Sequence, residues 1–153
     1  MDDNFDLDKL REPKRSRINS RTKGNSFERK IAKMLNEKFS TDEFNRSPGS
    51  GAFATTHKLP DHIECKKGYN KENLYSLYNY SSNFWGFINQ CEKDSGCCNK
   101  LPLIIYQQDR QKPLAITRKD IFPHNIQHVL LTNEDGQTYS MYLLEDILEC
   151  DKT

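Results

Sequence analysis

The segment Asp61-His62-Ile63-Glu64-Cys65-Lys66 combines residue types that can act on a phosphate ester. Glu64 and Lys66 are two residues apart, so a β-strand would direct both side chains to one face. A carboxylate placed in this way can bind a hard cation such as Mg²⁺. The ammonium group beside it can steady an attacking hydroxide or the charge that develops in the transition state. The spacing therefore indicates metal-assisted chemistry on a phosphate.

Asp61 stands at odd spacing from that pair. On one straight strand it would face away from Glu64, because successive side chains point to opposite faces. Pro60 permits a turn or a bulge that would re-aim the Asp61 carboxylate toward Glu64. The same alternation places His62 beside Glu64 and Lys66, which makes its imidazole a rival metal ligand. Both arrangements stay open from the sequence.

Four further blocks flank this segment in the sequence: Lys23-Gly24-x-x-Phe27-Glu28-Arg29, Arg46-Ser47-Pro48-Gly49-Ser50-Gly51-Ala52, Trp85-x-x-x-x-Gln90 and Pro102-Leu103-Ile104-Ile105. Together, in this order, the five blocks resemble the PD-(D/E)xK nuclease superfamily. They are most similar to a phage and prophage branch that resembles Holliday-junction resolvases. The resemblance covers residues 23–116. It implies a restriction-endonuclease-like α/β core, in which helices pack on a central mixed β-sheet.

The resemblance also implies a function, namely that of a metal-dependent endonuclease that hydrolyses DNA phosphodiester bonds. The similarity to Holliday-junction resolvases implies that the substrate could be branched or junction DNA. Asp61 and Glu64 would bind Mg²⁺, which Mn²⁺ could replace, with Glu28 in support. Lys66 would position or activate the attacking water, and Gln90 would assist nearby. The family aspartate usually lies on the preceding strand, whereas here two residues separate Asp61 from Glu64. Because of that short spacing, a second function stays open: the protein could have a degenerate nuclease fold that binds DNA without cutting it. A third alternative is a domain that has no nucleic-acid role.

Glu28 and Gln90 each have an alternative, structural explanation. An apolar stripe predicts a helix over residues 25–39, and Asn25-x-x-Glu28 at its start resembles a capping box. In that case Glu28 would serve the helix end and not a metal. Gln90 falls off the apolar face of a helix predicted over 83–93, so a solvent-exposed glutamine is equally consistent with the pattern.

The remaining elements follow from apolar alternation and turn residues. We expect a short strand at 43–46, a glycine-rich loop, and an antiparallel hairpin formed by strands 52–56 and 62–67. After a loop at 94–100, the apolar run 102–106 predicts a central buried strand, and 114–117 a neighbouring one. Asp135-Gly136 marks a second hairpin, of 129–132 with 137–141, before a helix at 143–150.

Length and composition indicate one domain with a small core. The chain has 153 residues, 35% of them hydrophobic, and a mean hydropathy of −0.90. We expect a flexible basic arm over residues 1–22 and a single domain over 23–153, with a core at 23–116 and a C-terminal hairpin and helix at 117–153. No apolar run has membrane-spanning length and no signal-peptide core is present. We therefore expect no membrane partner and an intracellular protein, in the cytoplasm of a bacterial or phage-infected cell.

DNA is the expected partner, although the net charge is only +1. Basic residues concentrate in the arm and just after it, where Arg15, Arg17, Arg21 and Lys23 could contact phosphates. Arg46 and Ser50 could do so from the glycine-rich loop. The tyrosines of 69–80 could stack on bases, although half-buried packing is the commoner role. A homodimer would suit a paired cut and stays open.

Five cysteines at irregular spacing are expected to be free thiols in a reducing compartment. A zinc site built from Cys91, Cys97 and Cys98 is not favoured, because these residues lack the usual two-residue gap between ligands.

Overall fold

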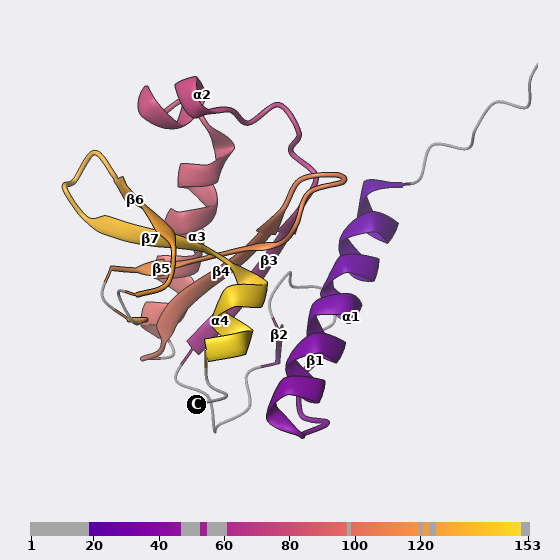
Figure 1. Cartoon of the computed structure of the whole chain (residues 1–153). Coiled ribbons are helices and arrows are strands. Elements are labelled where there is room, and N and C mark those ends of the chain that lie inside the picture. Colours follow the sequence, from indigo (N-terminus) through magenta and orange to yellow (C-terminus); the bar gives the residue numbers. More distant parts are fainter. Residues whose placement is uncertain are drawn as a thin grey trace, which may run out of the picture.

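The computed structural model describes residues 19–46, 53–54, 61–97, 99–119, 121–122 and 125–150, with the backbone alone described at 45–46, 53–54 and 61. Within these ranges a five-stranded sheet forms the centre of the molecule (Figure 1). The strand order is β3-β4-β5-β7-β6, with bounds β3 Asp61–Lys67, β4 Leu101–Gln107, β5 Leu114–Arg118, β6 His128–Thr132 and β7 Thr138–Leu143. Among the strand pairs of the described sheet, only β3–β4 is parallel. The predicted α/β fold with a mixed sheet is confirmed.

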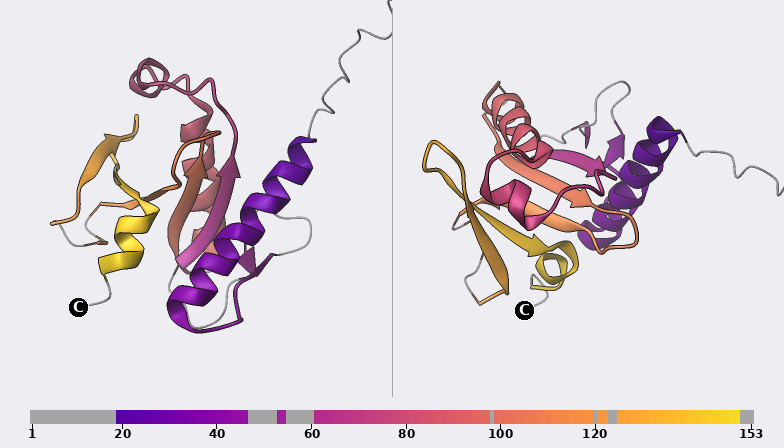
Figure 2. Two further views of the ribbon diagram at one scale, coloured as in Figure 1. Left: turned by 45° about the vertical axis from the view of Figure 1, so that its right-hand side comes forward. Right: turned by 90° about the horizontal axis from the view of Figure 1, so that it is seen from above.

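The two faces of the sheet are covered by different helices, α1 (Ser20–Phe39) and α3 (Asn83–Cys97). Ile63, Cys65, Leu103 and Ile105 pack with buried residues of α1. The intervening strand positions, Ile104, Tyr106 and Ile116, pack with buried residues of α3. Figure 2 shows the sheet between these helices, with α4 (Leu144–Cys150) on the α1 side. Alternation along β3 and β4 therefore divides the core into two layers.

The parallel pairing of β3 with β4 was not predicted. Its one-to-one register runs from Asp61 opposite Leu101 to Lys67 opposite Gln107. The predicted hairpin of 52–56 with 62–67 is wrong for the described strands, because β2 (Phe53–Ala54) pairs with β1 (Asn45–Arg46) instead. A parallel pair needs a long crossover, which here includes α2 (Leu74–Tyr78) and α3.

Helix α1 begins five residues earlier than predicted, with Asn19 as its cap. The Asn19 side chain accepts a hydrogen bond from the Arg21 amide (3.0 Å). Residues 20–22, expected in the flexible arm, are thus helical, whereas residues 1–18 lie outside the described part. Ser40 ends the helix in the left-handed conformation. The polar first turn explains the missed start, since it has no apolar periodicity to indicate a helix.

Two side chains cap the start of α3: Ser82 just before the helix and Glu72 from the segment before α2. Ser82 Oγ accepts a hydrogen bond from the Phe84 amide (3.1 Å). Glu72 accepts hydrogen bonds from Ser82 Oγ and from Asn83 Nδ2. At its other end α3 runs to Cys97, so the loop predicted from Asp94 is wrong in its first part. These contacts fix the helix that covers Glu64 and Lys66.

A partly exposed charge network joins α3 to strands β5 and β7. Arg118 donates two hydrogen bonds to the Glu92 carboxylate, and Tyr139 donates a third from its hydroxyl (3.0 Å). Burial would raise the pKa of Glu92, but the hydrogen bonds from Arg118 and Tyr139 outweigh it and lower that pKa. The ionised form of Glu92 is therefore the one that stabilises the fold.

Glu92→Gln should reduce the free energy of unfolding at pH 7 by about 1–3 kcal/mol, because two charge-assisted hydrogen bonds are weakened. The folded-state pKa lies below the ordinary value of 4.5, so the contribution is present above pH 4.5 and disappears as the pH falls through the folded value. Thermal unfolding between pH 7 and pH 3 should show a flatter dependence for Glu92→Gln than for wild type. Glu134→Gln, in the exposed β6–β7 turn, is the control. Equal pH profiles for wild type and Glu92→Gln would contradict this assignment.

The C-terminal part matches its prediction closely. Residues 133–137 connect β6 and β7, with Gly136 at φ 82°, and α4 follows β7 directly. The four described cysteines, Cys65, Cys91, Cys97 and Cys150, are free thiols, as expected. None of the described helices combines the length and the apolar character that crossing a membrane requires.

Candidate active site

Glu64 and Lys66 face the α3 side of the sheet. Their partners in the parallel register are Ile104 and Tyr106, which both belong to the core layer under α3. The two side chains form an ion pair, with 2.7 Å between Lys66 Nζ and Glu64 Oε1. Glu64 is only 5% exposed, whereas the Lys66 side chain keeps 23% of its surface in solvent. A buried carboxylate thus lies beside an ammonium group that a ligand can reach.

Side chains of α3 complete the surroundings of this pair. The ring of Phe87 lies under the Lys66 ammonium group, 5.2 Å from ring centre to Nζ. One turn further along, Cys91 Sγ contacts the carbonyl oxygen of His62 (3.7 Å). Burial, and next the negative charge of Glu64, raise the pKa of the Cys91 thiol to about 12. Cys91 therefore stays protonated and serves as a packing residue. The negative charge of Glu64 on β3 thus influences a side chain of α3.

Glu28 is buried in α1, with 7% of its surface exposed. Because α1 begins at Ser20, Glu28 lies in the third turn and cannot close a capping box with Asn25. The capping alternative is thus wrong. Glu28 follows Phe27 and precedes Ile31 on the buried stripe of the helix. A carboxylate in such a place needs a compensating partner or a function.

The thiol of Cys65 lies near both carboxylates. Burial contributes most to its raised pKa, followed by the negative charges of Glu28 and then Glu64, whereas Lys66 lowers it. Cys65 faces α1 and the Glu64–Lys66 pair faces α3. The two acidic side chains therefore flank the same short stretch of β3, one from α1 and one from the strand itself.

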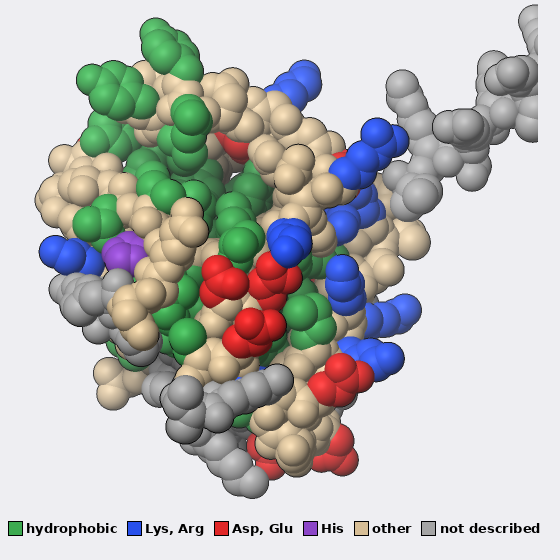
Figure 3. Space-filling view, in the orientation of Figure 1, with side chains coloured by type: hydrophobic (Ala, Val, Ile, Leu, Met, Phe, Trp, Pro, Cys, Tyr) green, Lys and Arg blue, Asp and Glu red, His purple; other side chains and the backbone are tan. Residues whose placement is uncertain are grey.

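A groove of about 530 Å³ opens where the first half of α1 meets the end of β3. Glu28 and Lys66 contribute to its wall, together with Arg21, Lys23, Lys67, Tyr69, Asn70 and others. Figure 3 shows Lys and Arg side chains along the α1 side of the molecule. Arg21, Arg29, Lys30 and Lys33 are exposed there. The groove thus combines a buried acid with a basic rim, which suits a polyanion.

The structure shows contacts at and beside this groove that the sequence did not indicate. Lys23 forms an ion pair with Asp109 in the β4–β5 loop, and Asn70 donates a hydrogen bond to the same carboxylate (2.8 Å). Lys67 donates to Gln107 Oε1 (2.9 Å). Burial lowers the pKa of Lys67; the charge of Asp109 opposes this effect, and Lys30 and Lys23 add to it. Asp109 lies 86 residues from Lys23 in the chain, so no local pattern could have revealed the contact.

Two other expectations concern α3 and the tyrosines. Gln90 is exposed and donates a hydrogen bond to Asp94 Oδ2 (2.8 Å) on the next turn, which agrees with the solvent-exposed alternative. Tyr69 packs edge-on against Phe87, with 4.6 Å between ring centres, and the hydroxyl of Tyr80 donates to the Thr132 carbonyl. Tyr75 and Tyr78 are 75% and 82% exposed on α2, so these two could stack on a ligand.

Several predicted site residues are not placed by the structure. The backbone of Asp61 starts β3, and the register contains no bulge between it and Glu64. Its carboxylate lies outside the described part, so its role stays a prediction. The same holds for the side chain of Arg46 and for Arg15, Arg17 and Ser50. Arg21 and Lys23 are described, and both line the groove.

The donor set around β3 suits a divalent cation only in part. Among the side chains that the structure describes, no three of the His, Cys, Asp and Glu residues form a group that could hold a metal ion. Glu64 and Glu28 supply oxygen donors of the kind that Mg²⁺ and Mn²⁺ accept. A catalytic cation keeps open positions for water and substrate, so few protein ligands suffice. A cation bound at Glu64 or Glu28 would therefore take most of its remaining ligands from water and phosphate.

Comparison with known proteins shows the family to which the chain belongs. The chain is similar to Protein D14 of Escherichia phage T5, with 28% identity over 137 residues that cover 77% of this chain and 85% of that protein. No solved structure matches the chain significantly. Residues 19–141 match the model of a family described as "Phage putative PDDEXK endonuclease". This match spans the groove, β3 and both covering helices, and the chain therefore belongs to the phage PDDEXK endonuclease family.

Proposed function

We propose that this protein is a divalent-cation-dependent DNA endonuclease whose reacting groups lie on β3. The observation that carries the proposal is the Glu64–Lys66 ion pair on a buried strand face, with Glu28 approaching the same stretch of strand from α1. Membership in the phage PDDEXK endonuclease family supports it. Structural ion pairs are common, but the Lys66 side chain of this pair and the buried Glu28 both line a groove with a basic rim.

The residues divide the work of phosphodiester hydrolysis. Glu64, with Glu28 and Asp61, would hold the cation. A bound divalent cation lowers the pKa of its water and offsets charge on the phosphate. Lys66 would orient the attacking water and stabilise the negative charge that grows on the phosphate oxygens as the new P–O bond forms and the ester P–O bond breaks. The leaving oxygen takes up a proton from solvent. Phe87 limits the positions of the Lys66 ammonium group.

The proposal is tested by cleavage of labelled linear, flapped and four-way DNA in Mg²⁺, Mn²⁺ or EDTA. We expect cleavage at least about 10²-fold faster with a cation than with EDTA, recovered when excess Mn²⁺ is returned. The best substrate shows whether branched DNA is preferred. Activity must coincide with the protein peak in size-exclusion chromatography, which controls for a contaminating nuclease. Cleavage that continues unchanged in EDTA would refute metal dependence.

A second function is favoured by one observation, the unbroken register between Asp61 and Glu64. Without a bulge, the strand offers no local means to bring the Asp61 carboxylate beside Glu64. A degenerate nuclease fold that binds DNA without cutting it would follow. Salt-dependent DNA binding in EDTA, with no cleavage of any substrate in either metal, would select this alternative.

Arg21 should contribute to DNA affinity through a phosphate contact. It is exposed at the rim of the groove, and it has no carboxylate partner among the described residues, whereas Lys23 is already paired with Asp109. Arg21→Gln should weaken binding several-fold for all sequences and reduce the slope of log K against log salt by about 1. Fluorescence anisotropy at several salt concentrations measures both. Lys119→Gln, exposed at the opposite end of the sheet, should change neither, and an unchanged slope for Arg21→Gln would remove it from the interface.

A further inference from the structure

The imidazole of His62 contains an unexplained polar atom. His62 is 8% exposed, and its Nε2 is buried without a hydrogen-bond partner, the one such side-chain atom within the described ranges. Buried polar atoms are normally satisfied, and an exception calls for a specific reason such as an ion or a functional role. Replacing this residue by an apolar one would remove the cost, so packing alone does not account for it.

His62 shares a strand face with the reactive pair. It lies two residues before Glu64 on β3, and the register pairs it with Pro102 without interruption up to Lys66 and Tyr106. Side chains at such spacing are neighbours on one face. Cys91 of α3 contacts the His62 carbonyl, so α3 covers this end of the face as Phe87 covers the other. The unpartnered nitrogen is therefore enclosed on the same side as the Glu64 carboxylate.

We propose that Nε2 of His62 is a ligand of the divalent cation at Glu64, and that this site consequently prefers Mn²⁺ to Mg²⁺. A neutral imidazole binds Mn²⁺ and later first-row metals well, whereas Mg²⁺ prefers oxygen ligands and retains its waters. The inference rests on the proposed function, because it assigns a residue to the cation of that site. With His62 as a ligand, Asp61 does not have to turn toward Glu64, because His62 and Glu64 already lie on the same face of β3.

The test measures Mn²⁺ binding directly, without DNA or catalysis. Free Mn²⁺ gives an electron paramagnetic resonance signal that is lost on binding, and Mg²⁺ affinity follows from competition. His62→Phe, which keeps an aromatic ring and removes the nitrogen, should raise the Kd for Mn²⁺ by about tenfold or more. The Kd for Mg²⁺ should change by less than about threefold. Equal Mn²⁺ affinity in His62→Phe and wild type would overturn the proposal.

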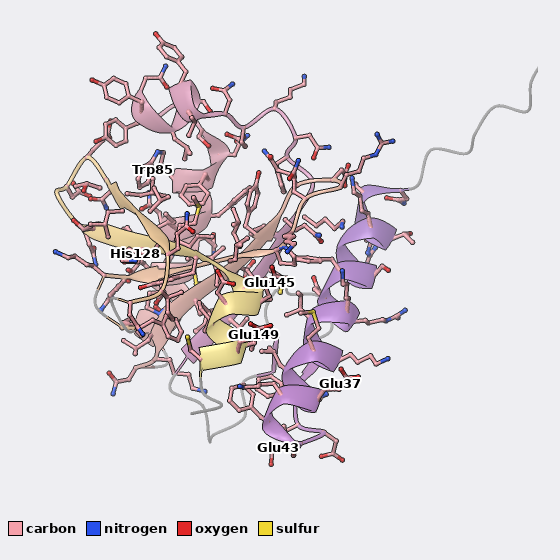
Figure 4. The ribbon with its side chains drawn as sticks, in the orientation of Figure 1. Glu37, Glu43, Trp85, His128, Glu145 and Glu149 are labelled. Carbon is pink, nitrogen blue, oxygen red and sulfur yellow. The ribbon has the colours of Figure 1, made fainter. Side chains whose placement is uncertain are left out.

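His128→Phe is the matched control. His128 lies on β6, at the edge of the sheet opposite β3 (Figure 4), and its Nδ1 already contacts the Ile126 carbonyl (2.7 Å). This variant should bind Mn²⁺ as wild type does. Should His62→Phe fail to fold, nuclear magnetic resonance of the wild type gives the same answer. Substoichiometric Mn²⁺ should broaden the ring signals of His62 before those of His128, and equal broadening would overturn the proposal.

Glu64→Gln separates failure of this inference from failure of the proposed function. If Glu64→Gln weakens Mn²⁺ binding and His62→Phe does not, the cation site stands and His62 is not its ligand. If wild type neither binds Mn²⁺ nor cleaves DNA, both proposals fail. Loss of Mn²⁺ affinity in both variants, with His128→Phe unaffected, supports both.

Discussion

Lys66→Met should reduce DNA cleavage by about 10²–10³-fold at saturating metal and substrate. The ammonium group lies 2.7 Å from Glu64 and stays partly accessible, where it can stabilise the charge that grows on the phosphate. Methionine keeps the length of the side chain and its contact with Phe87 but carries no charge. The measurement is the single-turnover rate on the best DNA substrate. Since Lys66 acts on the transition state, DNA affinity should fall far less than the rate.

This variant leaves the buried Glu64 carboxylate without its cation, so loss of folding must be separated from loss of chemistry. The double variant Glu64→Gln/Lys66→Met removes both charges and should unfold at a temperature close to that of wild type, while remaining inactive. Lys112→Met is the matched control, because Lys112 also pairs with a glutamate, Glu145 on α4. Cleavage by a folded Lys66→Met protein at the rate of Lys112→Met would exclude Lys66 from the mechanism.

Glu28→Gln should lower the cleavage rate by about 10–10²-fold and raise the metal concentration needed for half-maximal rate. Glutamine has the same shape and removes only the negative charge. If the charge of Glu28 serves the cation and not the fold, thermal stability should be preserved. Rates titrated against Mn²⁺ give both quantities.

Glu37→Gln provides the comparison on the same helix. Glu37 is exposed near the other end of α1 (Figure 4) and pairs with Lys33 at 3.8 Å. It should alter neither the rate nor the metal requirement. If Glu28→Gln unfolds at a much lower temperature and keeps its rate per folded molecule, then Glu28 is a structural residue and the family-based assignment fails.

The geometry of the Glu64–Lys66 pair could be predicted from spacing alone, because alternation along a strand is a local property. Glu28 could not be resolved in this way. Asn25 and Glu28 imitate a capping box, and only the position of the true cap, Asn19, excludes it. The contact of Lys23 with the β4–β5 loop and that of Lys67 with the last residue of β4 were beyond prediction, since they depend on tertiary structure. The chemical roles of these residues are still proposals.

For the fold, strong local patterns succeeded and long-range pairing failed. The strand β4 could be predicted from its apolar run, and the turn between β6 and β7 from its Asp-Gly pair, because each pattern lies within a few consecutive residues. The partner of β3 depends instead on a crossover through α2 and α3. Sequence proximity favoured a hairpin with residues 52–56, whereas the structure pairs β3 with β4 in parallel. The five-residue helix α2 was missed because Leu74, Tyr75 and Tyr78 are exposed and none of its residues is buried.

The distance along the chain between β3 and β4 also matters for how the protein is made. The ribosome releases residues 61–67 well before residues 101–107, which pair with them, and α3 emerges in the interval. Pairings between distant residues form late in folding, and nascent chains fold as complete units. A growing chain therefore carries Glu64 and Lys66 before it has the strand and helix that enclose them. If the proposed cutting activity is correct, it would begin only after residue 107 has left the ribosome, because the surroundings of Glu64 and Lys66 are incomplete before that point.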